Sequence, residues 1–323
     1  PYLKSSFDPV LNLDSSYIWH LVAIKRKQKC CNDLYTNLNG TWCHDYDTVM
    51  RIHQSGGQIV HVPHVLYHWR QHAASTTNNS LGENKRSLDS VNSVLALHIK
   101  KLEHPKHYSI SIWPENRGVK ELYITRLNND LPKFITLEEL IKNPLDNYGE
   151  DTILMIANPK ILINSELVFA EVYRLFKLHQ NLGAIGGLVC NKDKVIDGCF
   201  IQKENGDIFS PWVKTTFEGN NYALLRKTQT VYSTGNLLSF FRLNQTKKII
   251  KKILQYNNKI SHIDSIKLCE KLNNDGFNTA FSPLVKAYTS LNKNNLKKYI
   301  SKIPKSGLIQ HSLDRYEESP WRP

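Results

Sequence analysis

The segment from Cys43 to Thr76, CHDYDTVMRIHQSGGQIVHVPHVLYHWRQHAAST, decides the fold that the sequence predicts. It begins with two acids, Asp45 and Asp47, in an apolar pattern that predicts a short helix. The pair Gly56–Gly57 is a helix stop signal, and the alternating residues Ile59–Val62 behind it predict a strand. Carboxylates at one end of this unit and a histidine-rich loop at the other predict a site. Such a pairing suits a base working beside a metal-bound or anionic substrate.

The same segment resembles the acceptor-side half of family 2 glycosyltransferases of the GT-A fold, especially bacterial enzymes that build surface polysaccharide. Those enzymes commonly read E/Q-D-Y-D-L-x-L-R, a glycine, and then I-V-H-I-P-x-V-L-Y-H-W-R-x-H-x-x-S-T. The matching residues here are HDYDTVMRI, GG and IVHVPHVLYHWRQHAAST, about thirty residues almost without gaps. This match is far more specific than a lone short motif.

The resemblance implies roles for the two acids. Asp45 falls where the family places the base that takes the proton of the acceptor hydroxyl, and we assign it that role. The alternative for Asp45 is an N-terminal helix cap. Asp47 is expected either to organise the site or to interact with the dipole of the first helical turn.

The resemblance also implies roles for the cluster that follows the predicted strand. His68 matches a histidine that often completes the metal shell or touches the diphosphate; the alternative is a packed or surface histidine. Arg70 and His72 are expected to contact phosphate oxygens, and arginine is the better bidentate donor. Tyr67 and Trp69 are expected on the acceptor side, where they either stack on a sugar or simply pack.

The flanking residues extend this interpretation to the whole chain. Residues 1–80 are expected to be the acceptor-side half of a first GT-A domain, whose nucleotide-binding half is expected upstream of Pro1. Residues 81–107 are expected to be a helical linker, with a helix at 88–102. Residues 108–300 are expected to form a second, degenerate GT-A-like domain, followed by a tail at 301–323.

Local patterns predict the elements of these parts. Apolar runs predict strands at 109–113, 121–125 and 152–156, and helices at 17–24 and 137–141. Because strands and helices alternate in the second part, we expect an α/β fold with a partly parallel sheet. The resemblance makes that fold GT-A, a Rossmann-like arrangement, present as one partial and one abbreviated copy in tandem.

An internal repeat supports the tandem arrangement. Residues 264–288, DSIKLCEKLNNDGFNTAFSPLVKAY, align with the Asp45 segment without a gap as far as the proline. In this alignment Gly276 falls on Gly56 and Leu272 on Ile52.

The repeat has lost the chemistry of the first copy. Ser265 stands at the base position, Lys267 at the second acid, and Thr289 near the histidine. Where the family reads N-N-D, whose acid binds the metal, this chain has Asn158-Pro159-Lys160. Since a charged lysine cannot ligate a divalent ion, we expect a degenerate copy; the alternative is that Lys160 replaces the charge of the metal.

The composition and net charge limit the classes of function that the chain can have. The chain has 323 residues, a hydrophobic fraction of 41% and a charged fraction of 22%, as in soluble globular proteins. Its net charge of +13 is consistent with nucleic acid, anionic membrane or phosphorylated partners. Four lysines at 247, 248, 251 and 252 are either a solvated helix face or a binding patch. Six cysteines without C-x-x-C spacing predict reduced, mostly structural thiols in a cytoplasmic protein, and the positive charge would suit docking on an anionic inner membrane leaflet.

Together these features predict an inverting glycosyltransferase of polysaccharide or O-antigen-type synthesis. The resemblance implies a nucleotide-diphosphate sugar donor, a glycan or lipid-linked glycan acceptor, and Mn²⁺ or Mg²⁺ as cofactor. One rival is a catalytically inactive transferase remnant that binds a glycan or a partner enzyme. The other is a nucleic-acid-binding protein, for which the chain has no helix-turn-helix, zinc or aromatic-platform signature. We therefore expect no nucleic-acid partner.

Overall fold

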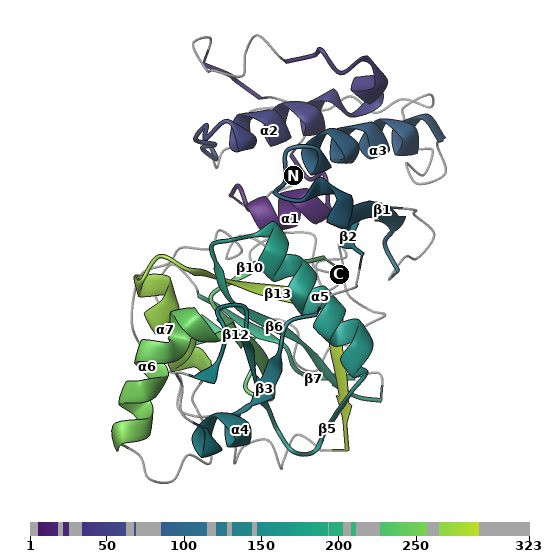
Figure 1. Cartoon of the computed structure of the whole chain (residues 1–323). Coiled ribbons are helices and arrows are strands. Elements are labelled where there is room, and N and C mark those ends of the chain that lie inside the picture. Colours follow the sequence, from purple (N-terminus) through teal and green to yellow (C-terminus); the bar gives the residue numbers. More distant parts are fainter. Residues whose placement is uncertain are drawn as a thin grey trace. The chain divides into compact units, whose positions relative to one another are not determined.

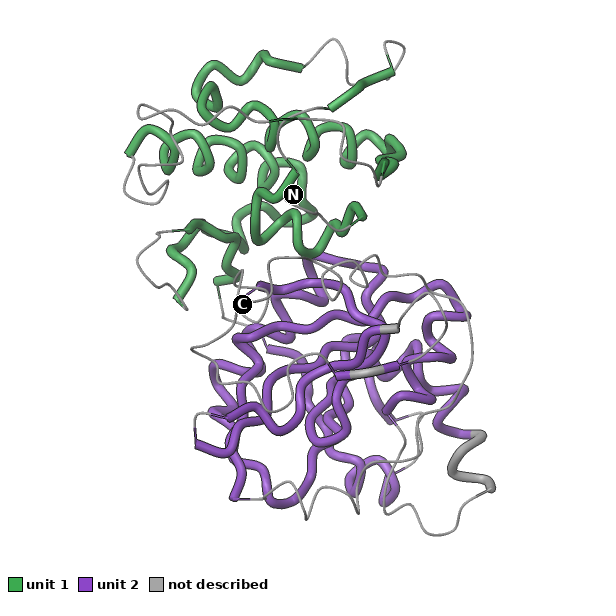
Figure 2. Tube along the Cα trace, turned by 180° about the vertical axis from the view of Figure 1, so that it is seen from behind, with its two compact units in different colours: residues 1–127, 315–323 green, residues 128–314 purple. Residues whose placement is uncertain are grey.

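A computed structural model gives the structure of the chain. It divides into two compact units, unit 1 at Pro1–Leu127 and unit 2 at Asn128–Asp314 (Figure 2). The structure describes residues 6–18, 22–25, 34–62, 68, 85–114, 121–127, 131–143, 147–192, 194–202, 208–210, 227–256 and 265–290. None of the described helices is long and apolar enough to cross a membrane.

Unit 1 is mainly helical (Figure 1). In chain order its described elements are α1 (Pro9–Asp14), the 3-10 helix η2 (Leu38–Cys43), α2 (His44–Gln54), α3 (Lys85–Ile99), the 3-10 helix η3 (Pro105–His107), β1 (Tyr108–Ile112) and β2 (Leu122–Arg126). The strands β1 and β2 form an antiparallel hairpin, which confirms the strands predicted at 109–113 and 121–125. The helix predicted at 88–102 is α3.

The helix predicted at 17–24 is wrong. The helix of this region lies earlier, at Pro9–Asp14, because Asp8 caps its N-terminus and Pro9 occupies its first turn. The Asp8 carboxylate accepts the main-chain N–H groups of Val10 and Leu11 at 2.9 and 3.2 Å. The described residues 15–18 and 22–25 contain no helix. The capping residue Asp8 and the following Pro9 therefore mark this helix, whereas the apolar spacing of residues 17–24 does not.

The helix that was predicted to link two domains belongs to the core of unit 1. Val94 and Leu95 of α3 are buried, and α3 contacts η2, α2 and both strands of the hairpin. The hydroxyl of Tyr46 on α2 donates to the main-chain oxygen of Leu13 at 2.9 Å, which joins α2 to the end of α1. The units consequently divide after Leu127, twenty residues beyond the predicted boundary at 107.

Unit 2 is an α/β unit built on a curled, mixed sheet. Its main sheet has the order β10-β13-β6-β12-β4-β3, with β5 on β13 and β7 on β6. The pairs β3–β4 and β13–β6 are parallel and the other pairs are antiparallel. The partly parallel sheet is thus confirmed. The strands are β3 (Phe134–Thr136), β4 (Ile153–Ala157), β5 (Ile161–Ile163), β6 (Leu182–Asn191), β7 (Lys194–Asp197), β10 (Gln229–Val231), β12 (Leu238–Arg242) and β13 (Asn278–Thr289). A smaller sheet joins β11 (Ser233–Thr234), β8 (Cys199–Gln202) and β9 (Ile208–Phe209).

Helices cover both faces of the main sheet. They are α4 (Leu137–Lys142), α5 (Ser165–Leu178), α6 (Leu243–Tyr256) and α7 (Ser265–Asn274), as Figure 1 shows. Neighbouring residues of β12 point to opposite faces. Phe240 contacts the stacked rings of Phe134 and Phe169 on the α5 side, whereas Phe241 packs in the core cluster of α6 and α7. Both side chains are fully buried, so the sheet has an apolar layer on each side.

The two halves of the internal repeat end their helices in the same way. After α2, Gly56 has φ +76°, and the N–H groups of Gly56 and Gly57 donate to His53 and Ile52. After α7, Gly276 has φ +86°, and the N–H groups of residues 276 and 277 donate to the main-chain oxygens of residues 273 and 272. Both are Schellman motifs, in which glycine supplies the left-handed conformation.

The chain after the two motifs differs. In unit 2 it becomes β13, in the interior of the main sheet. In unit 1 the strand predicted at Ile59–Val62 is wrong, since residues 57–62 form none, and Val60 and Val62 are 72% and 56% exposed. The strands described in unit 1 pair only with each other. A β-prone segment without a sheet beside it cannot form ladder hydrogen bonds.

The contact between β6 and β13 requires a glycine. A Cβ built on Gly187 would overlap the main-chain oxygen of Val285. We expect Gly187→Ala to destabilise unit 2 by about 3 kcal/mol, because backbone must move to admit the methyl group. Urea unfolding followed by circular dichroism measures the change. Gly149→Ala is the matched control, since no atom lies within 4 Å of its added Cβ. Equal stability of the two variants would contradict the prediction.

Candidate functional site

Asp45 lies in the first turn of α2 and is half-buried. The residue at the cap position is Cys43, whose side chain makes no cap hydrogen bond. The alternative role of Asp45 as a helix cap is therefore wrong. In the part of the chain that the structure describes, Asp45 has no hydrogen-bond or ion-pair partner. Its carboxylate is accessible at the positive end of a helix dipole.

Asp47 has a different environment on the same helix. It is 4% exposed, and its carboxylate accepts the Nε–H of Arg51 at 2.8 Å. The two residues are four positions apart, so the ion pair lies along one face of α2. Asp47 is consequently held by the helix itself, whereas Asp45 is not.

The cluster predicted behind the strand lies mostly outside the described residues. His68 is described and exposed, while Tyr67, Trp69, Arg70 and His72 are outside the described ranges. Within those ranges, no three His, Cys, Asp or Glu side chains lie together as a metal site would require. The implied Mn²⁺ or Mg²⁺ therefore has no group of three protein ligands among the described residues, and no reaction step is assigned to a metal.

The surroundings of Asp45 contain rings that sequence reasoning did not single out. Tyr35 and Trp42 are 62% and 49% exposed, and the ring of Tyr35 meets that of His44 edge-on at 5.8 Å. Between the rings and the acid, burial and the charge of Asp45 raise the pKa of the Cys43 thiol to about 11. Cys43 is thus a poor nucleophile at neutral pH. The spacing W-C-H-D places Trp42 near Asp45, but the sequence carries no signal that the ring is exposed.

In unit 2 the residue at the position corresponding to Asp45 is buried. Ser265 begins α7, is 2% exposed, and accepts a hydrogen bond from the Ser239 hydroxyl at 3.3 Å. Lys267, at the position of Asp47, is exposed. A buried serine without a neighbouring base cannot deprotonate an acceptor.

The other two altered positions of unit 2 come together. The Thr289 hydroxyl donates to the main-chain oxygen of Lys160 at 2.8 Å, where β13 pairs with β5. The Asn158 side chain accepts the Lys160 N–H at 3.0 Å, and the Lys160 side chain is exposed. Lys160, Asn158 and Thr289 therefore lie together where β5 meets the end of β13.

Asp197 is a buried carboxyl group that the sequence interpretation missed. It is 5% exposed and accepts the main-chain N–H of Leu237 at 2.5 Å, with further main-chain bonds from Gly198 and Asn236. Burial raises its pKa from 3.8 to about 6, although these hydrogen bonds oppose the shift. A Cβ on Gly235 would lie 2.6 Å from the Asp197 carboxylate. Asp197 thus holds the turn between β11 and β12.

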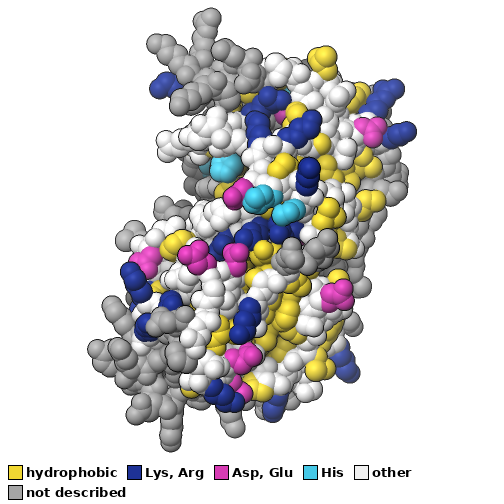
Figure 3. Space-filling model, viewed as in Figure 1, with side chains coloured by type: hydrophobic (Ala, Val, Ile, Leu, Met, Phe, Trp, Pro, Cys, Tyr) yellow, Lys and Arg dark blue, Asp and Glu magenta, His cyan; other side chains and the backbone are white. Residues whose placement is uncertain are grey.

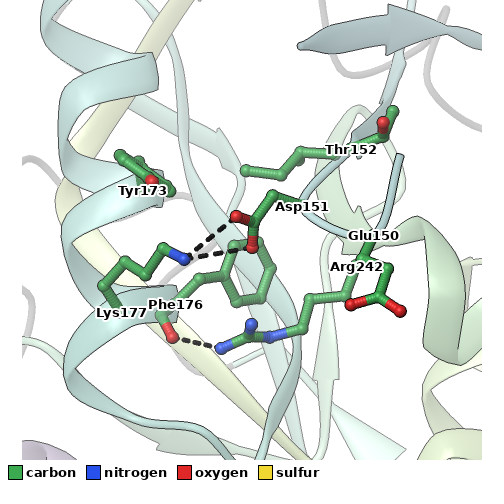
Figure 4. Close-up of a pocket in the computed structure, with 8 residues that line it drawn as sticks. Glu150, Asp151, Thr152, Tyr173, Phe176, Lys177 and Arg242 are labelled. Atoms are coloured by element: carbon green, nitrogen blue, oxygen red, sulfur yellow. Dashed lines mark hydrogen bonds and ion pairs between the residues drawn. The ribbon is translucent and has the colours of Figure 1, made fainter. Parts of the chain in front are cut away.

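A small depression at the end of α5 holds ion pairs and hydrogen bonds (Figure 4). The Arg242 guanidinium donates to the main-chain oxygens of Phe176, His179 and Leu182, and lies 4.7 Å from the centre of the Phe176 ring. Lys177 contacts both carboxylate oxygens of Asp151 at 3.0 and 3.1 Å. Arg242 satisfies carbonyl groups that a helix end leaves open, which explains the cluster as structural.

The lysine and arginine side chains are dispersed over the face that Figure 3 draws. On the face in Figure 3, Lys and Arg side chains are scattered among polar and apolar ones. On α6, Lys248 and Lys251 are exposed while Ile249 and Ile250 are buried. These two lysines lie on the outer side of an amphipathic helix, as a solvated face would.

No protein-family model, no curated protein and no solved structure matches this chain. The family interpretation consequently rests on the sequence resemblance alone.

Asp197 gives unit 2 a specific pH dependence. Because its pKa is about 6 when folded and 3.8 ordinarily, the folded state binds the proton more tightly. Lowering the pH from about 7 to about 5 should therefore stabilise the wild type by about 1 kcal/mol relative to Asp197→Asn. Urea unfolding at several pH values measures this difference, with Asp275→Asn as an exposed control in unit 2. An identical pH dependence in the wild type and Asp197→Asn would contradict the prediction.

Proposed function

We propose that the chain is a GT-A-type, family 2-like glycosyltransferase whose unit 1 carries the acceptor-side chemistry. It moves a sugar from a nucleotide-diphosphate donor to a glycan hydroxyl with inversion, in polysaccharide or O-antigen-type synthesis. The observation that carries the proposal is the contrast within α2: Asp47 is buried and paired with Arg51, whereas Asp45 is half-buried and unpaired among the described residues. A base must be accessible, and Asp45 is the acid that meets this requirement.

The proposed reaction uses Asp45 as a general base. Its carboxylate takes the proton of the acceptor hydroxyl while the hydroxyl oxygen forms a bond to the anomeric carbon. The bond from that carbon to the diphosphate oxygen breaks, and the nucleoside diphosphate leaves with the electron pair. Attack opposite to the leaving group inverts the anomeric configuration.

The remaining parts of the proposal come from the resemblance. His68, Arg70 and His72 are proposed on the diphosphate side and Tyr67 and Trp69 on the acceptor side. A bound Mn²⁺ or Mg²⁺ would neutralise charge on the leaving diphosphate. The acceptor is proposed to be a glycan, in lipid-linked form at the inner membrane face of a cytoplasmic enzyme.

Unit 2 is proposed to be a non-catalytic copy. Its position for the base holds the buried Ser265, and its position for the metal-binding acid holds the exposed Lys160. The shared Schellman geometry after α2 and α7 supports a common origin of the two helix–turn segments. The alternative that Lys160 replaces the charge of a metal is compatible with its exposure.

A second candidate function is favoured by the loss of acids in unit 2. If Asp45 serves no reaction, the whole chain is a transferase remnant that binds a glycan or a partner enzyme. The two functions differ in turnover, because only the first releases a nucleoside diphosphate from a sugar donor.

Turnover tests the role of Asp45. Wild-type chain is incubated with UDP-, dTDP- and GDP-sugars and a glycan acceptor mixture, and nucleoside diphosphate release is followed. We expect Asp45→Asn to lower the rate by about 100-fold or more, because it removes the base. Glu138→Gln, a first-turn acid exposed on α4, is the control and should leave the rate unchanged. Full activity of Asp45→Asn would exclude Asp45 as the base, and an inactive wild type would favour the remnant.

Thermal stabilisation tests whether the chain holds a donor site. We expect UDP with Mn²⁺ to raise the unfolding temperature, and EDTA or the His68→Ala change to reduce that rise, since a ligand stabilises the state that binds it. The same measurement is made with UDP alone, with Mn²⁺ alone, and with dTDP or GDP in place of UDP. The same temperature under all conditions would count against a donor site in this chain.

A further inference from the structure

The segment before α2 exposes large side chains that folding leaves uncovered. Tyr35, Leu38 and Trp42 are 62%, 83% and 49% exposed. Scattered exposed apolar residues are ordinary, but these three lie within eight positions and directly precede Asp45. We call Tyr35, Trp42 and His44 the ring surface.

Two hydrogen bonds to α3 hold the segment that carries the ring surface. The N–H of Trp42 donates to the Ser90 hydroxyl at 3.3 Å, and the Cys43 thiol donates to the main-chain oxygen of Ser87 at 3.8 Å. Ser87 and Ser90 are themselves buried. Inside η2, the Thr41 hydroxyl donates to the Leu38 oxygen at 2.6 Å. The backbone of η2 is thereby fixed while its one ring, Trp42, is half-exposed.

Tyr35 has an unusual backbone conformation. Its φ is +61°, in the left-handed region that a bulky side chain rarely adopts. The Tyr35 ring meets that of His44 edge-on at a centroid distance of 5.8 Å, and Tyr35 is 62% exposed. Strained backbone that does not serve burial occurs most often at binding sites.

Charged groups border the rings. The Arg86 guanidinium lies 5.9 Å from the centre of the Trp42 ring, and Asp45 follows His44 directly in α2. An exposed ring with a cation over one face and a carboxylate three positions along the chain matches the chemistry of a pyranose. The C–H groups on one face of the sugar stack on an aromatic ring, while its hydroxyl groups bond to the charged groups.

From this arrangement we infer that the ring surface is a glycan subsite, in which sugar units of an acceptor glycan stack on the rings of Trp42 and Tyr35, near Asp45. The inference deepens the proposed function, since it places the acceptor at the base, but sugar binding itself does not require turnover. A protein partner fits less well, because specific protein interfaces bury about 1,000 Å² or more and three side chains supply far less.

Binding is measured without a donor, on a printed array of oligosaccharides of hexoses, N-acetylhexosamines and deoxyhexoses. The best oligosaccharide is then titrated against chain labelled with 5-fluorotryptophan, with Trp42→Ala identifying the ¹⁹F resonance of Trp42. We expect that resonance to shift on titration. Trp42→Ala and Tyr35→Ala should each weaken binding by about tenfold or more.

The matched control is Tyr288→Ala in unit 2. Tyr288 is also 49% exposed and has a cation, Lys286, 5.7 Å from its ring centre. Its removal should leave binding unchanged. Unchanged affinity in Trp42→Ala, an unmoved Trp42 resonance, or an array without any bound oligosaccharide would overturn the inference. If the chain binds a glycan but releases no nucleoside diphosphate from any donor, the glycan subsite is supported and the transferase function is contradicted.

Discussion

The close approach of β6 and β13 is the constraint on which unit 2 depends. Gly187 has no side chain, so the backbone of Val285 comes against it, and β13 changes register between Phe281 and Lys286. Pro283 lies inside this irregularity, where a strand tolerates a residue without an N–H group. Beside it the Ser282 hydroxyl donates to a buried Glu171–Arg174 ion pair of α5 at 2.7 Å. One bulge thereby joins the sheet to the helix that covers it.

Local sequence signals predicted the position of most helices and strands. The wrong predictions arose where tertiary context determined the structure. The helices at α3 and α4 and the strands β1, β2 and β4 could be predicted, because capping, periodicity and length agree there. The segments after Gly56 and Gly276 have similar sequence patterns, yet only the second becomes a strand. A strand needs a neighbouring edge, and no property of residues 58–62 reveals whether one is present.

The candidate site was predictable in its residue types and unpredictable in its environment. Sequence placed two acids at the start of α2 but could not distinguish accessible Asp45 from Asp47, because their difference lies in burial and in the ion pair with Arg51. The exposure of Trp42 and the buried carboxyl of Asp197 were missed for the same reason. Accessibility is a property of the packed chain, whereas a motif fixes only the order of side chains.

The position of β13 has a consequence for the way unit 2 folds. This strand is the last described element of the chain, yet it lies between β10 and β6 in the interior of the sheet. Its partners on β6 are about one hundred residues earlier, so their pairing closes a long loop. Such distant contacts slow folding. During synthesis, the edge of β6 that pairs with β13 therefore stays open until β13 itself has been made, about one hundred residues later.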